Sequence, residues 1–82
     1  MSDVMVISTT GQRIVRLVQD RWPLNLPMPV FLEEDSRAVR FRWEGRQFLV
    51  DGEFEVWERL WDGQHLRNDT LGARLLTSLL GA

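Results

Sequence analysis

The chain has 82 residues, of which 44% are hydrophobic and 27% charged; this composition is typical of one small folded domain and too apolar for a disordered chain. It contains no cysteine and one histidine, which excludes a disulfide framework and a thiol nucleophile and leaves too few ligands for a zinc centre. The 10 basic residues, all arginine, and 12 acidic residues give a net charge of -2, which argues against a dedicated nucleic-acid binder.

No apolar run approaches the roughly 18 residues needed to span a membrane. The first residues, MSDVMVIS, lack the basic start and long apolar run of a signal peptide. We therefore expect a single small domain over 1–82 in the cytoplasm, with no membrane partner. Residues 1–8 are expected to form either a loose tail or an edge strand.

The first predicted element is a helix over 9–22. Thr9 and Gln12 have the spacing of a capping box, in which each side chain satisfies the other's free backbone N–H group. Apolar residues then recur at helical intervals on one face: Ile14, Leu17, Val18 and Trp22. Pro23 ends the helix, because the residue before a proline avoids helical backbone angles.

Residues 23–29 contain all three prolines and are expected to form an extended connector within the domain. Leu24, Leu26 and Met28 stand at alternate positions in this segment. The alternation predicts that these three side chains lie across the core.

Residues 30–61 are predicted to form an antiparallel sheet. A short strand over 30–32 is followed by a turn in EEDSR, and a second strand covers 38–43, where apolar residues alternate with arginines. Successive side chains of a strand point to opposite faces, so this pattern buries one face and exposes the other.

A two-residue hairpin turn at Glu44-Gly45 sets the register of the next strand. A shift by one residue would bury arginines, so the pattern favours one register. The predicted cross-strand pairs are Trp43 with Arg46, Arg42 with Gln47, Phe41 with Phe48 and Val39 with Val50.

A second turn at Asp51-Gly52 leads to a third strand that ends near Trp61. A three-residue loop over 51–53 is preferred, because it places Phe54 and Val56 on the apolar face, whereas a two-residue loop would bury Glu53 and Glu55. The opposite face is then expected to carry Arg40, Arg42, Gln47, Leu49, Glu55 and Trp57.

The last predicted element is a helix over 69–80, capped by Asn68 or Asp69. Its leucines form a broad apolar stripe that must be buried on the sheet or on a second copy of the protein: Leu71, Leu75, Leu76, Leu79 and Leu80. Gly72 costs about 1 kcal/mol relative to alanine inside this helix. The predicted fold is α+β, with an N-terminal helix, a three- to four-stranded antiparallel meander and a C-terminal helix packed on the sheet.

Residues 37–48 interleave arginines with aromatic residues, the pattern of a single-stranded nucleic-acid platform; the arginines are Arg37, Arg40, Arg42 and Arg46. The alternation places Phe41 and Trp43 on the face opposite Arg40 and Arg42, so the two sets cannot easily serve one ligand. We therefore prefer to interpret the rings as core and the arginines as a solvated strand face.

Trp57 and Trp61 are the second set of candidates, together with Arg40 and Arg42. Aromatic residues and arginine are the side chains that dominate protein interfaces. The alternative is that all four tryptophans belong to the core.

The remaining polar residues predict no catalytic or metal site and no cofactor. The acidic residues of 51–58 are interpreted as charge pairing across the sheet, with Glu55 near Arg40 and Arg42; they are Asp51, Glu53, Glu55 and Glu58. His65 follows a turn and is interpreted as a surface or capping residue. No phosphate-binding loop or metalloprotease motif occurs, so we expect a non-enzymatic protein.

Within 39–61, an FRW-x-GR hairpin is followed by a strand with valine, arginine and tryptophan; the matching residues are Phe41, Arg42, Trp43, Gly45, Arg46, Phe48, Val50, Val56, Glu58, Arg59 and Trp61. This signature resembles a small bacterial domain family of unknown function, some of whose members are appended to, or lie near, DNA-polymerase-like proteins of mutagenic repair. The sequence departs from the family pattern by an insertion at 51–53 and by Leu60. The resemblance implies a bacterial source and a link to repair, and it carries over no catalytic residue.

Two functions follow as expectations. The preferred one is a small interaction module that binds another protein or itself through Arg40, Arg42, Trp57 and Trp61. The alternative is a nucleic-acid-associated accessory domain that uses the arginines of residues 37–48.

Overall fold

The computed structural model describes residues 8–81. The elements follow in the order α1 (Thr10–Arg21), β1 (Val30–Glu34), β2 (Val39–Trp43), β3 (Arg46–Val50), β4 (Val56–Arg59), β5 (Leu66–Arg67) and α2 (Leu71–Leu79). The expected tail or edge strand at 1–8 falls on residues 1–7, which lie outside the described residues, and on Ser8, which precedes α1 without regular structure.

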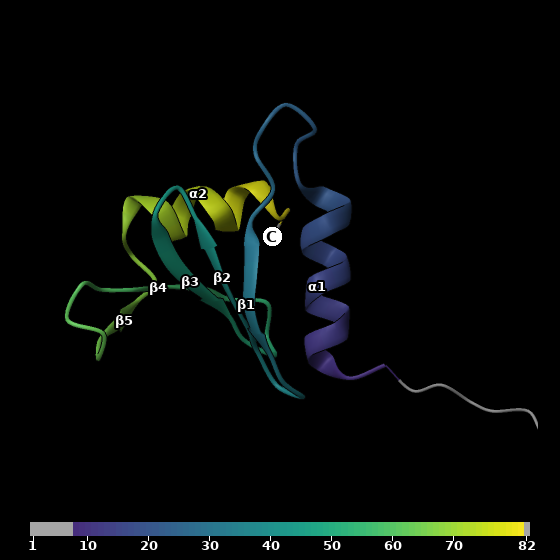
Figure 1. The fold of residues 1–82 in the computed structure, drawn as a ribbon, viewed down its shortest axis with the longest axis horizontal. Helices are drawn as coiled ribbons and strands as arrows, with labels where there is room; N and C mark the ends of the chain where they lie inside the picture. The colour runs from purple at the N-terminus through teal and green to yellow at the C-terminus, as the bar shows by residue number, and fades with distance from the viewer. Residues whose placement is uncertain (1–7, 82) are drawn as a thin grey trace, which may run out of the picture.

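The five strands form one antiparallel sheet in the order β1-β2-β3-β4-β5, so each strand pairs with its neighbour in sequence. Both helices lie on the same side of this sheet, α1 beside β1 and β2 and α2 against β4 (Figure 1). The predicted α+β fold is confirmed. Its meander includes a two-residue strand, β5, that no sequence pattern indicated.

The start of α1 confirms the predicted capping box. The Thr9 hydroxyl accepts a hydrogen bond from the Gln12 backbone N–H at 3.1 Å, and the Gln12 side chain accepts one from the Thr9 N–H at 2.9 Å. Ile14, Val18 and Trp22 are buried against the sheet. The polar residues of the opposite face of α1 remain in solvent, as the helical spacing predicted.

The connector after α1 is not evenly extended, and the predicted placement of its apolar residues is wrong for two of three. Leu24 is fully exposed and Met28 is exposed, whereas Leu26 packs against the core. The reason is a turn at its start, closed by the Leu26 N–H donating to the Pro23 carbonyl at 3.2 Å, which removes the two-residue period. The Trp22 indole N–H then donates to the Pro27 carbonyl at 2.8 Å and fixes the connector.

The register of β2 and β3 is the predicted one throughout, from Val39 opposite Val50 to Trp43 opposite Arg46. Glu44 and Gly45 both have positive φ, 55° and 72°, as a type I′ hairpin turn requires. Strand β1 is longer than expected, because Glu33 and Glu34 also pair with β2 after a register shift between Phe31 and Glu33.

The loop between β3 and β4 has five residues, not three, since Val50 pairs with Val56. The predicted and the observed loop both have an odd number of residues, so the side chains of β4 alternate as predicted and Val56 still reaches the buried face. Phe54 does not continue that face: its φ is 61° and its side chain is exposed. The extra length is stabilised by Asp51, whose carboxylate accepts hydrogen bonds from the Glu53 and Glu55 N–H groups at 2.9 and 3.1 Å.

The cap of α2 is Thr70 instead of Asn68 or Asp69, and its hydroxyl accepts from the Ala73 N–H at 3.1 Å. Leu76 and Leu80 are buried on the sheet and Leu79 partly so, which confirms the packing of this helix. Two of the five leucines of the predicted stripe, Leu71 and Leu75, are instead exposed.

The core lies between the helices and one face of the sheet. Its members are Ile14, Val18, Trp22, Val39, Phe41, Phe48, Val50, Val56, Ala73, Leu76 and Leu80. The opposite face of the sheet contributes none of these residues.

Candidate interaction surface

The face of the sheet opposite the helices is here called the open face, because no helix within residues 8–81 covers it (Figure 1). Strand pairing assembles its side chains in two rows across the sheet. In the first row Leu49, on the central strand β3, lies between Arg40 and Trp57. In the second row Gln47 lies between Arg42 and Arg59, and Leu66 of β5 follows Arg59.

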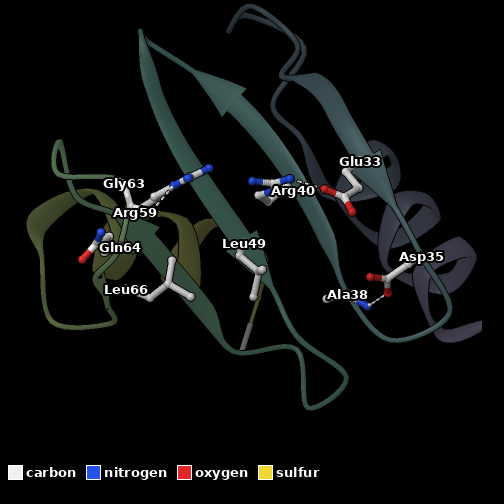
Figure 2. A pocket seen from close by; sticks show the side chains of 9 residues that line it. All are labelled: Glu33, Asp35, Ala38, Arg40, Leu49, Arg59, Gly63, Gln64 and Leu66. Carbon is white, nitrogen blue, oxygen red and sulfur yellow. Dashed lines mark hydrogen bonds and ion pairs between the residues drawn. The ribbon is translucent and has the colours of Figure 1, made fainter.

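A shallow cavity of about 350 Å³ lies in the open face. Figure 2 shows Arg40 and Arg59 on either side of it, with Leu49 between them and Leu66 at one flank. Arg40 forms an ion pair with Glu33 of β1. The cavity is therefore lined by apolar side chains, by two guanidinium groups and by the carboxylates of Glu33 and Asp35.

Two of the three arginines of the open face carry uncompensated charge. Arg59 donates to the Gly63 carbonyl at 3.0 Å and to the Gln47 side-chain oxygen at 3.5 Å, and both acceptors are neutral. Within the described part of the chain, neither Arg42 nor Arg59 forms an ion pair. The second row of the open face therefore carries two uncompensated guanidinium charges, with Glu44 in the adjoining turn.

Trp57 has acidic surroundings. Its indole N–H donates to the Asp51 carboxylate at 3.0 Å, and its ring is half-buried. It lines a wide hollow of about 580 Å³ together with Asp51, Glu53 and Glu55, with Arg37 among the other lining residues. The Trp57 ring thus lies at the negative end of the open face.

Trp61 lies in the loop between β4 and β5, where its side chain is 98% exposed and lines a hollow together with Gln47 and Arg59. The Asp62 carboxylate organises this loop by accepting hydrogen bonds from the backbone N–H groups of Gln64 and His65 and by contacting the His65 Nδ1 at 2.5 Å. The Gln64 N–H contributes most, followed by the His65 ring, and together they lower the pKa of Asp62 to about 2. His65 is a surface residue of this loop, as the sequence indicated.

The candidate residues of the preferred function are partly brought together. Arg40, Arg42 and Trp57 share the open face, whereas Trp61 lies beyond the end of β4. Two of the four tryptophans belong to the helix side: Trp22 and Trp43 pack edge to face there, with ring centroids 5.4 Å apart. The other two, Trp57 and Trp61, are not part of the core.

The arginines of residues 37–48 do not form one platform. Arg37 lies in the turn between β1 and β2, and Arg46 lies on the helix side, where it forms a bidentate pair with Glu58 at 2.6 and 2.9 Å. Sequence reasoning missed Arg59 and Leu66. The signal for Arg59 was present, because the two-residue period of β4 places it on the same face as Trp57.

Two acidic residues differ from their predicted roles. Glu55 accepts a hydrogen bond from the Asn68 side chain at 2.6 Å, and the carboxylate that pairs with Arg40 is Glu33. Glu58 is buried, because its position in β4 places it on the same face as Val56. The expected pairing of exposed charges does not describe either residue.

Within residues 8–81, no group of three or more histidine, aspartate or glutamate side chains is placed to hold a metal ion. None of the helices in this range has the length and hydropathy required to cross a bilayer. Comparison with protein-family models, with curated proteins and with solved structures finds no match to this chain.

Proposed function

We propose that the protein is a small, non-enzymatic interaction module that binds another protein, or a second copy of itself, through the open face. The observation that supports this most directly is the pair of half-buried apolar side chains, Trp57 and Leu49, among three arginines on a sheet face that no helix of residues 8–81 covers. Tryptophan and arginine contribute most of the binding energy in protein interfaces. The proposal includes a cytoplasmic location and no cofactor.

The polar groups support a binding role more than a catalytic one. The Glu58 carboxylate is already occupied by Arg46 and by the Thr70 hydroxyl at 2.5 Å. The Asp62 carboxylate is likewise occupied by its own loop. Both carboxylates stabilise the fold, and their oxygens are engaged in hydrogen bonds and thus not free to accept a proton from a substrate.

A selection of displayed random peptides on the immobilised protein tests the proposal. We expect selected peptides to bind the wild-type chain and to lose at least about tenfold in affinity, or about 1.4 kcal/mol, when Arg40→Glu and Arg42→Glu are combined. The matched control is Arg13→Glu with Arg16→Glu, on the exposed face of α1. If the Arg40/Arg42 variant retained every selected peptide and any self-association, or if the wild-type chain showed neither, the proposal would be wrong.

The second candidate is a nucleic-acid-associated accessory domain, linked to repair by the sequence resemblance. It is favoured by the uncompensated charges of Arg42 and Arg59. It is disfavoured by the surroundings of Trp57, because a base stacked on this ring would bring its phosphate close to Asp51 and Glu53.

A further inference from the structure

The open face carries its uncompensated arginines, Arg42 and Arg59, toward one end and a cluster of carboxylates toward the other. The turn between β1 and β2 and the loop between β3 and β4 lie at the same end of the sheet, because the strands alternate in direction. The loop carries Asp51, Glu53 and Glu55 beside Trp57. The row of Arg42, Gln47 and Arg59 lies toward the other end, which is closed by the turn at Glu44-Gly45.

We infer that the open face binds a second copy of this chain, face to face, about a two-fold axis that runs across the strands. This inference rests on the proposed function and names its partner. Such an axis reverses the strand direction, so the acidic end of each copy lies over the basic end of the other while β3 lies over β3. A two-fold interface repeats every contact, so both pairs of ends are matched at once.

The same two-fold axis brings Trp57 of one copy into contact with Arg59 of the other. Trp57 and Arg59 are two residues apart on β4 and point to the same face, so reversal of the strand places Trp57 of one copy over Arg59 of the second copy. A guanidinium over an indole face forms a favourable cation–π contact, for which tryptophan is the best of the aromatic rings. Glu53 and Glu55 lie in the loop that leads into β4 and reach the same guanidinium.

The two remaining open-face arginines do not oppose this arrangement. On β2, reversal places Arg42 of one copy over Arg40 of the second copy. Arg40 is already paired with Glu33, so the ion pair as a whole faces Arg42. The centre of the interface is then formed by Leu49 and Gln47 of both copies.

The size of the open face predicts a weak dimer. Five strands about 4.8 Å apart, most of them about five residues long, offer less than the roughly 800 Å² per partner of a standard interface. We therefore expect a dissociation constant in the micromolar range or above. Association should weaken with salt, because these charges are exposed and screened over about 10 Å at 0.1 M ionic strength.

Sedimentation equilibrium of the full chain, from about 1 μM to about 1 mM, measures the dimer directly. We expect the mass to rise from one chain to two over this range at low salt. Two variants reverse one end each: Arg42→Glu with Arg59→Glu, and Glu53→Arg with Glu55→Arg. Each variant alone should weaken the dimer at least about tenfold, because like charges then face each other at both contacts.

The decisive measurement is the equimolar mixture of the two variants, in which every reversed end meets a complementary one. We expect a heterodimer that regains the wild-type affinity within about threefold. Arg13→Glu with Arg16→Glu is the control and should leave the dimer unchanged. Arg42→Glu alone is included, and because Arg42 faces Arg40 and its partner Glu33, it should weaken the dimer much less than the double variant, which assigns the loss to Arg59.

A chain that stays monomeric to about 1 mM would overturn the inference, and so would a dimer that neither variant weakens or that the mixture does not restore. Sedimentation and peptide selection together distinguish the failure of this inference from the failure of the proposed function. If the chain is monomeric but displayed peptides bind and are lost with Arg40→Glu and Arg42→Glu, the open face binds another protein. If neither is seen, both proposals are wrong.

Discussion

Glu58 shows how a charged residue becomes part of the core. It is 5% exposed, and its carboxylate accepts two hydrogen bonds from Arg46 and one from Thr70. These three bonds offset the cost of removing the carboxylate from water. They also connect β3, β4 and the cap of α2 through one side chain.

Replacement of this residue, Glu58→Ala, should lower the free energy of unfolding by about 2–3 kcal/mol, because Arg46 and Thr70 then lose their charged partner. Glu53→Ala is the control, since Glu53 is exposed, and should change stability by less than about 0.5 kcal/mol. Urea denaturation of both variants measures the difference. Equal effects would show that the Glu58 network does not stabilise the fold.

The Asp62 carboxyl makes the pH dependence of one loop predictable. Its pKa is lowered from 3.8 to about 2, so the stabilisation is complete above pH 4 and is lost as the pH falls toward 2. A carboxyl titration by NMR should give a midpoint near this value. In His65→Ala the midpoint should rise but stay below 3.8, because the largest contribution comes from the Gln64 N–H. A wild-type midpoint at 3.8 would contradict the loop geometry.

At the scale of elements, both helices approach the sheet through a glycine in their first turn. A Cβ on Gly11 would overlap the backbone carbonyl of Asp35 in the turn after β1. A Cβ on Gly72 would lie 3.0 Å from the Phe48 ring and from the Glu58 carboxylate. The glycine that appears unfavourable for α2 in the sequence is therefore what allows the helix to lie close to β3 and β4.

Gly72→Ala should destabilise the protein by about 1–3 kcal/mol through overpacking, although alanine favours a helix by about 1 kcal/mol. Gly11→Ala should cost more, because the atom in the way belongs to the backbone. Gly52→Ala is the matched control, since its Cβ would meet only ordinary contacts at 3.5 and 3.6 Å. Thermal unfolding should show Gly11→Ala as the most destabilised variant, Gly72→Ala as the next and Gly52→Ala as the least. A stabilising Gly72→Ala would show that α2 can move away from the sheet.

How much of each element could be predicted depends on how strongly its residues specify it. The β2–β3 hairpin was predictable because alternation and a two-residue turn both fix the same register. The β3–β4 loop was not, because loops of three and five residues satisfy the same alternation, and only the hydrogen bonds of Asp51 decide between them. Strand β5 has two residues and thus no period to detect.

At the scale of the whole molecule, the asymmetry of the layers creates the candidate site. The alternation of side chains along the strands correctly predicted that Arg40 and Arg42 share one face. Trp57 was also predicted on that face, although the predicted loop was two residues too short, because loops of three and five residues give the same alternation. The opposite charges of the two ends were not predictable, since they depend on which turns meet at one end of the sheet. The exposure of Trp61 likewise depends on the path of a loop.

A tryptophan-fluorescence titration with single-stranded DNA and RNA checks the nucleic-acid alternative. We expect little change at low or physiological salt, because Trp57 lies among carboxylates and Arg46 is held by Glu58. The matched probe is the Arg42→Glu variant, which should behave like the wild type. Strong quenching at low salt that falls steeply with ionic strength, and that Arg42→Glu abolishes, would favour the accessory domain and its link to repair.

The neighbour-to-neighbour strand order also has a kinetic consequence. Every strand pair can close from a turn of a few residues, so most of the sheet forms without a large loss of chain entropy, and we expect folding on the millisecond scale or faster. Among the hydrogen bonds of residues 8–81, those that span the most sequence join the Arg21 guanidinium to the carbonyls of Leu80 and Gly81, at 2.5 and 3.1 Å. It can form only after both helices have docked, so its loss should speed unfolding and leave the folding rate unchanged.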